Sequence, residues 1–305
     1  MKTAIGVDLG GTKLYLAVVD SAAHIREEIR LPTPVEQGGD AILELLSAEL
    51  EKLIARHPVT SIGIGTPGLV DFPSGTILGC TPNLPGWEKR SLREVLQHRL
   101  QKPVVVDNDA NVAAWGEYCH SFRTQASSLV MLTLGTGLGS GMIWNDHLLR
   151  GHRQLGIGFG HMIVEPHGRM CNCGQQGCLE AYVSGNGLLK GYRLRGGATA
   201  VKGPEIFSRA AQGETAARAT VTEFLDLLAV GIVNILNTLA PEYLVLGGGI
   251  SQQGEEILLQ PVRARIGAIM GMPFRSPEMV TLARLGASAG VIGAALLALK
   301  MDEQT

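Results

Sequence analysis

The sequence has almost no net charge and no strongly basic segment. It contains 26 Lys and Arg against 28 Asp and Glu, a formal net charge of −2, and no Lys/Arg-rich run. Nucleic acids are bound mainly through clusters of basic side chains. We therefore expect no nucleic-acid partner.

The sequence also lacks an export or membrane signal. Its N-terminus has no positively charged segment followed by a long apolar one, so no signal peptide is predicted. The most apolar stretch, residues 290–300, is shorter than the roughly 20 apolar residues that span a bilayer. A buried terminal helix is the better interpretation. We expect a cytoplasmic protein without a membrane partner, in a compartment where clustered cysteines bind metal more often than they form disulfides.

Glycine, in contrast, is plentiful. The 305 residues include 40 glycines, which cluster in short motifs, and 45 % of all residues are hydrophobic. A chain of this length is long for one hydrophobic core, so two lobes are the default expectation.

Strand-like and helix-like segments alternate along the chain, which predicts an α/β fold. Strands are predicted at residues 3–7, 13–19, 61–65, 103–106 and 243–246. Helices are predicted at residues 41–56, 91–100 and 216–239, the last being long, mostly apolar and followed by a proline.

One internal repeat indicates how the lobes are organised. Residues 7–20 and 132–145 each read as an apolar strand, a Gly/Thr-rich turn and a second apolar strand. Two units that begin with the same hairpin suggest two lobes of similar topology around a central cleft. We expect a small N-terminal α/β lobe at residues 1–112, to which a helix at about 290–305 returns, and a large α/β lobe at residues 113–289.

The first glycine turn has the chemistry of a phosphate cradle. It joins two strands, so it is neither a Walker loop nor a dinucleotide-binding fingerprint. Gly10 and Gly11 let backbone N–H groups approach an anion closely, while Thr12 adds a hydroxyl and Lys13 a cation. Asp8 could hold Mg²⁺ through water. An ordinary tight hairpin is the alternative.

Two further glycine motifs favour a nucleotide over that alternative. The second turn repeats the pattern of the first with Gly135, Thr136, Gly137 and Gly139. Gly247, Gly248 and Gly249 directly follow the strand predicted at residues 243–246, and they offer a surface on which a flat purine or ribose can lie closely.

Polar residues follow the strand predicted at residues 103–106. Asn108 and Asp109 stand where α/β proteins usually bind ligands. A carboxylate there could accept a hydroxyl proton during phosphoryl transfer, as an aspartate does in kinases. The alternative is a helix N-cap, since Asp or Asn before Ala-Asn-Val-Ala-Ala-Trp is a normal helix start. One residue can cap while the other reacts.

Three of the five cysteines lie within eight residues. Cys171, Cys173 and Cys178 are separated by glycines that allow tight bends, and His161 precedes them by ten positions. Together they form the Cys₃His set of a closed structural zinc site. A disulfide would leave one thiol unmatched. The sequence predicts a zinc-pinned loop.

In this order, the motifs resemble those of the ROK (repressor, open reading frame, kinase) family of sugar kinases across nearly the whole chain. They include the turn at residues 8–13, the Gly160-His161 pair and the C-x-C-G-x-x-G-C-x-E pattern that ends at Glu180, and as an ordered set they are highly specific. The stretch TPNLPGW at residues 81–87 looks most like the family's glucokinases. Other segments are similar to bacterial N-acetylglucosamine kinases.

The resemblance implies an actin-like, two-lobed ATPase fold of the ribonuclease H type. It also implies transfer of the γ-phosphate of ATP, with Mg²⁺, to the 6-hydroxyl of glucose or of an N-acetylhexosamine such as N-acetylglucosamine or N-acetylmannosamine. Asp109 would be the general base, and the zinc would shape the sugar pocket without taking part in the chemistry. The implied sugar-binding residues are Gly68, Asn83, Asn108, Asp109, His161 and Glu180. The resemblance suggests a homodimer.

One position departs from the family. A glutamate usually stands three residues before the histidine and binds sugar hydroxyls, and here that position is Gly158. The family's bacterial N-acetylmannosamine kinases can also lack this glutamate. Two alternative functions are therefore retained: a degenerate ROK protein that binds sugar with little kinase activity, and a sugar-responsive transcriptional regulator. The regulator is disfavoured because the first phosphate turn begins at Asp8, which leaves no room for a DNA-reading domain before it.

Overall fold

The computed structural model describes residues 1–79, 83–271 and 276–303. Thr81 and Pro82 of the TPNLPGW stretch lie outside the described residues. Contacts divide the chain into two units, the first made of Met1–Gln125, Gly141–Ile157 and Ala287–Thr305, and the second of Ala126–Ser140 and Gly158–Gly286. The helix Asp109–Glu117 lies entirely in the first unit.

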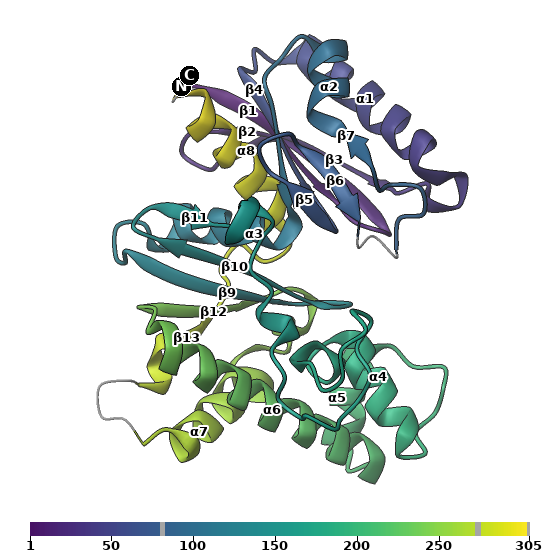
Figure 1. Ribbon diagram of the computed structural model, residues 1–305, viewed down its shortest axis with the longest axis vertical. Helices are drawn as coiled ribbons and strands as arrows, with labels where there is room; N and C mark the ends of the chain where they lie inside the picture. Colours follow the sequence, from purple (N-terminus) through teal and green to yellow (C-terminus); the bar gives the residue numbers. More distant parts are fainter. Residues whose placement is uncertain (80–82, 272–275, 304–305) are drawn as a thin grey trace. The chain divides into compact units, whose positions relative to one another are not determined.

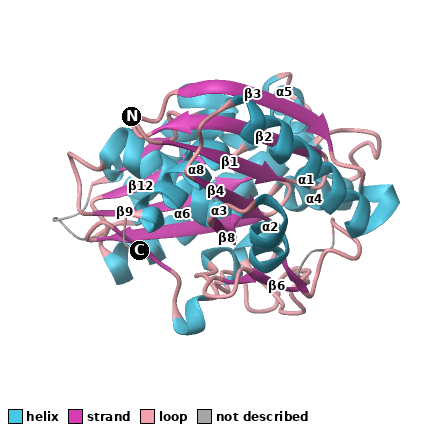
Figure 2. Ribbon diagram, turned by 90° about the horizontal axis from the view of Figure 1, so that it is seen from above, coloured by secondary structure: helices cyan, strands magenta, loops and turns pink. Residues whose placement is uncertain are grey.

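The first unit is built on a five-stranded sheet with the order β3-β2-β1-β4-β8, which can be followed in Figure 2. Its strands are β1 (Thr3–Leu9), β2 (Lys13–Asp20), β3 (Ile25–Pro32), β4 (Ser61–Thr66) and β8 (Val104–Asn108). β1 pairs antiparallel with β2 and parallel with β4, and β4 pairs parallel with β8. The four strands predicted in this region are confirmed. β3 was not predicted, because half of the eight residues of this edge strand, IREEIRLP, are charged and Glu27 interrupts the apolar alternation.

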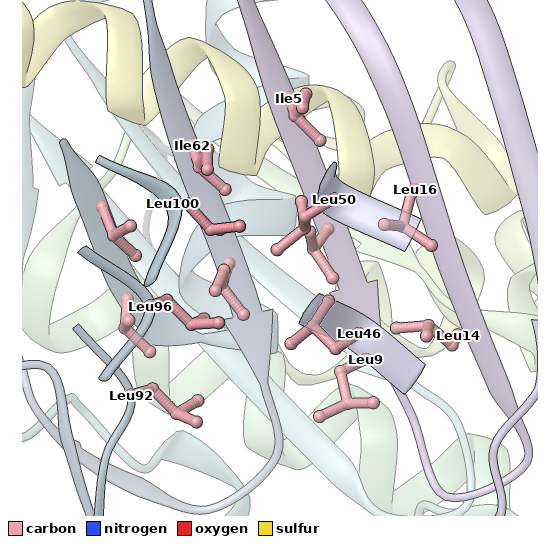
Figure 3. Packing of buried hydrophobic residues seen from close by; sticks show 14 of the residues in the cluster. Ile5, Leu9, Leu14, Leu16, Leu46, Leu50, Ile62, Leu92, Leu96 and Leu100 are labelled. Atoms are coloured by element: carbon pink, nitrogen blue, oxygen red, sulfur yellow. The ribbon is translucent and has the colours of Figure 1, made fainter. Parts of the chain in front are cut away.

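One face of this sheet packs on two helices, α1 (Gly38–Arg56) and α2 (Leu92–Leu100), both of which were predicted. Because side chains alternate between the faces of a strand, Ile5 and Leu9 of β1 point to the same core (Figure 3). Leu46 of α1 and Leu96 of α2 are fully buried in that core. Each such side chain contributes roughly 1.5–3 kcal/mol through its burial.

The opposite face is covered by the terminal helix α8 (Ala289–Asp302), which lies against β1 and β4 (Figure 1). Glycines on both strands permit this close approach. A Cβ on Gly6 would lie 1.8 Å from the Val291 carbonyl oxygen, and one on Gly63 would lie 1.8 Å from that of Ala294. The terminal helix predicted from the apolar run at residues 290–300 is confirmed.

The first unit also contains a small sheet and a further helix. A three-stranded sheet consists of β5 (Leu69–Asp71), β6 (Thr76–Gly79) and β7 (Arg90–Ser91). Helix α3 (Asp109–Glu117) follows β8 and continues into a π-helical turn, Tyr118–Phe122. α3 packs on α8, where Gly293 allows its backbone to approach the Val112 carbonyl.

The second sheet has the strand order β11-β10-β9-β12-β13. Its strands are β9 (Ser128–Leu134), β10 (Leu138–Trp144), β11 (His147–Leu149), β12 (Tyr243–Gly247) and β13 (Val280–Leu282). β9 and β13 both pair parallel with β12. The predicted second hairpin is therefore confirmed as β9 and β10, and the strand predicted at residues 243–246 as β12.

The helices of the second unit are α4 (Gly185–Leu194), α5 (Gly203–Ala211), α6 (Thr215–Leu239) and α7 (Gln260–Ile269). α6 confirms the long helix predicted there. It is apolar and long enough to cross a membrane by composition alone, but 61 % of its most apolar window is buried inside the protein. The core helix of a soluble protein passes the same test.

Candidate active site and metal centre

In the first unit, the expected site residues gather at one edge of the sheet. The parallel strands β1, β4 and β8 all end there, and their register places Asp8 beside Gly65 and Thr66 beside Asn108. The first glycine turn follows β1, Gly68 follows β4, and Asp109 follows β8. The carboxyl ends of parallel strands are the usual ligand-binding edge of such sheets.

Asn108 is the N-cap of α3, one of the two roles left open for this segment. Its Oδ1 accepts hydrogen bonds from the backbone N–H groups of Ala110 at 2.9 Å and Asn111 at 3.4 Å. Its Nδ2 donates to the Gly68 carbonyl at 3.1 Å. A carboxamide carries two N–H donors, and a hydrogen bond from the Asn108 side chain to the Asp109 carboxylate lowers the pKa of Asp109, against the larger effect of burial. The side chain fixes both the helix start and the Gly68 loop.

Asp109 is the first residue of α3 and is half-buried. Its Oδ1 accepts a hydrogen bond from the backbone N–H of Ala110 at 2.9 Å. Burial, followed by the nearby negative charge of Asp8, raises the pKa of Asp109 to about 6. A carboxyl group with this pKa is mostly ionised at pH 7 and close to the range where proton acceptors are effective.

Asp8 lies near the end of β1, just before the first glycine turn, and its charge acts on Asp109. Burial raises its pKa above the ordinary value, and the Lys13 charge opposes this shift. A Cβ on Gly290, in the first turn of α8, would lie 2.9 Å from the Asp8 Cγ. Because anions are stabilised near a helix N-terminus, the start of α8 is a favourable place for this carboxylate.

The first glycine turn is held by its own backbone and by Thr33, which directly follows β3. Gly10 N–H donates to the Lys13 carbonyl at 2.9 Å, and the Thr33 hydroxyl donates to the Gly10 carbonyl at 2.7 Å. Asn83 lies directly against the turn, since a Cβ on Gly11 would be 3.0 Å from the Asn83 carbonyl oxygen. The structure therefore brings Asn83 and the turn together.

A buried ion pair beneath Asp109 was missed by the sequence analysis. Arg150 Nε donates to Asp107 Oδ2 at 2.8 Å, and the two side chains are only 11 % and 2 % exposed. Asp107 Oδ1 also accepts from Asn111 Nδ2 at 2.9 Å and from the Asn108 N–H at 2.7 Å. The guanidinium stacks 3.5 Å from the centre of the Phe72 ring. Because Asp107 directly precedes Asn108 and Asp109, this network fixes the end of β8.

In the second unit, two glycine motifs lie side by side. The turn between β9 and β10 is closed by a hydrogen bond from Gly135 N–H to the Gly137 carbonyl at 3.0 Å. Gly248, at φ +83°, abuts the end of β9, where an added Cβ would lie 2.6 Å from the Leu134 carbonyl oxygen. β12 pairs parallel with β9 up to Gly247 and Thr133. The two motifs thus share one sheet edge.

The four expected metal ligands converge in the second unit. One donor atom from each of His161, Cys171, Cys173 and Cys178 lies within 4.8 Å of the other three. Cys173 Sγ is 3.6 Å from Cys178 Sγ, and Cys171 Sγ is 3.8 Å from His161 Nδ1. Zn–S bonds of about 2.3 Å at tetrahedral angles place sulfur atoms about 3.8 Å apart. The donor set therefore fits a structural Zn²⁺ ion.

The loop around these ligands requires glycine at one sharp bend. Gly177 has φ +80°, and a Cβ there would lie 1.8 Å from the Glu165 carbonyl oxygen. Its neighbours close the loop through Val164 N–H to the Gly177 carbonyl at 2.9 Å and Cys171 N–H to the Gln175 carbonyl at 2.9 Å. The cysteines are thus presented by a hydrogen-bonded backbone.

The two remaining candidate sugar ligands lie beside this donor set. His161 turns Nδ1 toward Cys171, so Nε2 lies on the opposite edge of the ring. Glu180 follows Cys178 by two residues, and its Oε1 is 3.6 Å from Cys171 Sγ. Gly158 accepts a hydrogen bond from His161 N–H at 3.0 Å through its carbonyl, and a Cβ on Gly158 would lie 3.3 Å from His161 Cδ2.

Comparison with known proteins places this architecture in one family. The ROK family model matches residues 4–301. A glucokinase of Streptomyces coelicolor is 34 % identical over 319 aligned residues, which cover 99 % of each chain. An N-acetyl-D-glucosamine kinase of Escherichia coli O127:H6 is 36 % identical, with 96 % of this chain and 98 % of that protein covered.

Solved structures agree. A ROK family glucokinase from Streptomyces griseus, in complex with glucose and AMPPNP, superposes with a TM-score of 0.83 at 33 % identity, covering 98 % of this chain and 99 % of that one. A ROK hexokinase from Thermus thermophilus has a TM-score of 0.84 at 32 % identity, covering 99 % and 100 %. The expected α/β fold of the ROK sugar kinases is confirmed, and the chain belongs to the ROK family.

Proposed function

We propose that this protein transfers the γ-phosphoryl group of ATP to the 6-hydroxyl of a hexose, either glucose or an N-acetylhexosamine. The observation that carries the proposal is the Asp109 carboxyl, whose pKa is raised to about 6 at the sheet edge that also presents Asp8 and the first glycine turn. The similar Streptomyces griseus glucokinase was solved with glucose and AMPPNP, which supports a hexose and an adenine nucleotide as the two substrates.

In this proposal the residues of the first unit handle the proton and the metal. Asp109 takes the proton of the attacking hydroxyl, which contributes a factor of roughly 10²–10⁴ to the rate. Asn108 contacts a sugar hydroxyl through its carboxamide, beside Gly68 and Asn83. Asp8 binds Mg²⁺ through water, while the backbone of Gly10 and Gly11, with Thr12 and Lys13, contacts phosphate oxygens.

The residues of the second unit bind the other parts of the substrates. The turn at residues 135–139 and the glycines at 247–248 contact the nucleotide. His161 contacts the sugar through Nε2 while Nδ1 binds Zn²⁺, and Glu180 contacts the sugar near its anomeric end. The zinc, held by His161 and the three cysteines, is structural. We further propose that the protein is a cytoplasmic homodimer. In each subunit, one lobe would consist of residues 1–112 with the terminal helix, and the other of residues 113–289.

The test is ADP release coupled to a reporter, with a panel of hexoses and N-acetylhexosamines, for the wild-type protein and Asp109→Ala. We expect one or a few sugars to be phosphorylated, with kcat at least 100-fold lower in the variant. Asp226→Ala, which alters an aspartate that is 55 % exposed on α6, is the matched control and should leave kcat unchanged. Equal rates for wild type and Asp109→Ala would exclude Asp109 as the base.

Gly158 motivates a second candidate, a protein that binds sugar with little turnover. A carboxylate that accepts a hydroxyl hydrogen bond contributes about 1.5–3 kcal/mol, so its absence corresponds to a roughly tenfold to hundredfold loss of sugar affinity. Gly158→Glu is expected to tighten binding of the true substrate by that factor in calorimetry. Tight sugar binding by the wild type without any phosphorylated product would favour this second candidate.

A further inference from the structure

The second glycine turn is held by the segment that leaves the metal centre. Leu138 N–H donates to Glu180 Oε2 at 2.8 Å. Gly185 N–H donates to the Gly135 carbonyl at 2.8 Å, and Asn186 N–H donates to the Thr136 carbonyl at 3.2 Å. Gly135, Thr136 and Leu138 of the turn are therefore each hydrogen-bonded to a residue between positions 180 and 186, shortly after Cys178.

Close packing accompanies these hydrogen bonds. A Cβ on Gly137 would lie 2.7 Å from Glu180 Oε2, so the carboxylate rests against the turn itself. On the other side, a Cβ on Gly160, which precedes the metal ligand His161, would lie 2.4 Å from the Leu138 carbonyl oxygen. The turn thus contacts segments at both ends of the metal-binding loop.

The position of Glu180 depends on the metal ligands around it. It lies in a 3-10 turn, Leu179–Ala181, that begins immediately after Cys178. Leu179 is fully buried, and its N–H donates to the Met162 carbonyl at 2.8 Å, next to His161. Glu180 Oε1 is 3.6 Å from Cys171 Sγ. Glu180 therefore contacts both the metal centre and the Leu138 N–H.

A cavity of about 70 Å³ lies between the turn and the metal centre. Its lining includes Thr136 and Gly137 of the turn, Cys171 and Glu180 of the metal-binding loop, and the cationic side chain of Lys190. The cationic Lys190 and the anionic Glu180 therefore line the same small cavity beside the turn.

We propose that Glu180 is a positioning residue that couples the metal centre to the nucleotide: with metal bound, its carboxylate holds the Gly135–Gly139 turn in the conformation that binds the phosphate groups of ATP. The proposal rests on the proposed nucleotide-binding role of this turn and assigns Glu180 a task separate from sugar contact. Because coupling between two binding sites is reciprocal, nucleotide binding must also tighten the binding of Zn²⁺.

The first test compares Glu180→Gln with Glu180→Ala in the zinc-loaded protein. Gln keeps an oxygen that can accept from Leu138 N–H, whereas Ala removes it. Titration with Mg²⁺-AMPPNP in the absence of sugar is expected to give a Kd within about threefold of wild type for Glu180→Gln. For Glu180→Ala we expect a Kd about 5–30-fold weaker, because one charge-assisted hydrogen bond is lost.

Zinc content and thermal unfolding of each variant, measured in parallel, establish that it is folded and loaded. A nucleotide Kd for Glu180→Ala within twofold of wild type would overturn the proposal, since Glu180 would then serve the sugar alone. If the wild type itself binds no Mg²⁺-AMPPNP, the proposed kinase function fails, and this outcome is distinct from the previous one.

The second test is decided by the wild-type protein, so it does not depend on whether a variant folds. Zinc affinity of the wild type is measured by competition with a chelator, with and without saturating Mg²⁺-ADP. We expect zinc to be held severalfold more tightly with nucleotide, and the same measurement on Glu180→Gln to give a similar factor. An unchanged zinc affinity in the wild type would contradict the coupling.

Discussion

The two glycine turns look alike in sequence but are fixed by different means. The first is closed by a hydrogen bond between the backbones of Gly10 and Lys13 and by one from the Thr33 hydroxyl to the Gly10 carbonyl. Its last residue, Lys13, also provides a cationic side chain. The second contains no cation of its own and is held by Glu180, Gly185 and Asn186 of the metal-binding segment. A repeated strand–turn–strand pattern therefore specifies the shape of a glycine turn but not what stabilises it.

The residues that surround the two turns also differ. Beside the first turn stand two carboxyl groups, Asp8 and Asp109, supported from below by the buried Asp107–Arg150 pair. Beside the second stands Gly248, whose lack of a side chain lets β12 end against β9. The first region is organised by charge, and the second by the cluster of His161 with three cysteines and by glycine packing.

Removing Arg150 is expected to have the largest effect on stability. Arg150→Ala leaves the Asp107 carboxylate buried without its cation, which costs about 3–5 kcal/mol in the free energy of unfolding. Arg123→Ala, in the same unit, is the matched control: it removes an ion pair with Asp146 whose side chains are 52 % and 38 % exposed, so about 1 kcal/mol or less is expected. Urea denaturation measures both. Similar losses for the two variants would show that charge does not organise the first region.

Asp109→Asn is expected to stabilise the protein at neutral pH. Because the folded pKa of about 6 exceeds the unfolded value, the wild type loses stability as pH rises from about 4 to about 6. Above that range the ionised carboxylate costs up to about 3 kcal/mol. The variant, which keeps an oxygen for the Ala110 N–H, should gain up to that amount at pH 7 and nothing below about pH 4. No gain at pH 7 in denaturant titrations would mean that the pKa is not raised.

Gly248→Ala tests the packing that supports the second turn. The position has φ +83°, and the new Cβ would meet Leu134 backbone atoms at 2.6–2.8 Å. We expect a loss of about 2 kcal/mol or more in the free energy of unfolding, together with weaker Mg²⁺-ADP binding. Gly249→Ala is the control, because a Cβ there meets nothing within 4 Å among the described residues. Equal behaviour of the two variants would contradict the close approach of β12 to β9.

The sequence predicted the local features of this fold better than its long-range contacts. Apolar periodicity and glycine placement sufficed for the two hairpins, α1, α6 and α8, since each pattern lies within one segment. The strands β5, β6 and β7 were missed because two to four residues carry too little periodicity. For Asn108 the sequence left the cap open, and the hydrogen bonds to Ala110 and Asn111 decide it.

The long-range interactions that hold the site residues in place could not be predicted from the sequence. Arg150 pairs with Asp107 across 43 residues, and Glu180 reaches Leu138 across 42. No local pattern marks such partners, because a buried pair is specified by the fold that brings its two members together. The convergence of His161 and the three cysteines was predictable because their residue types and close spacing are rare in combination.

The central claim is that Asp109 accepts the proton during phosphoryl transfer. The most direct test is the rate measured as kcat/KM for the sugar, from pH 5 to pH 8, for wild type and Asp109→Asn, because kcat/KM reports the pKa of the group before the sugar binds. With a carboxyl pKa of about 6, the wild-type rate should be level above pH 7 and fall toward a tenfold loss per pH unit below about 6. The slow residual rate of the variant should lack this step. A wild-type rate that stays constant down to pH 5, or a variant that retains the same profile, would contradict the account.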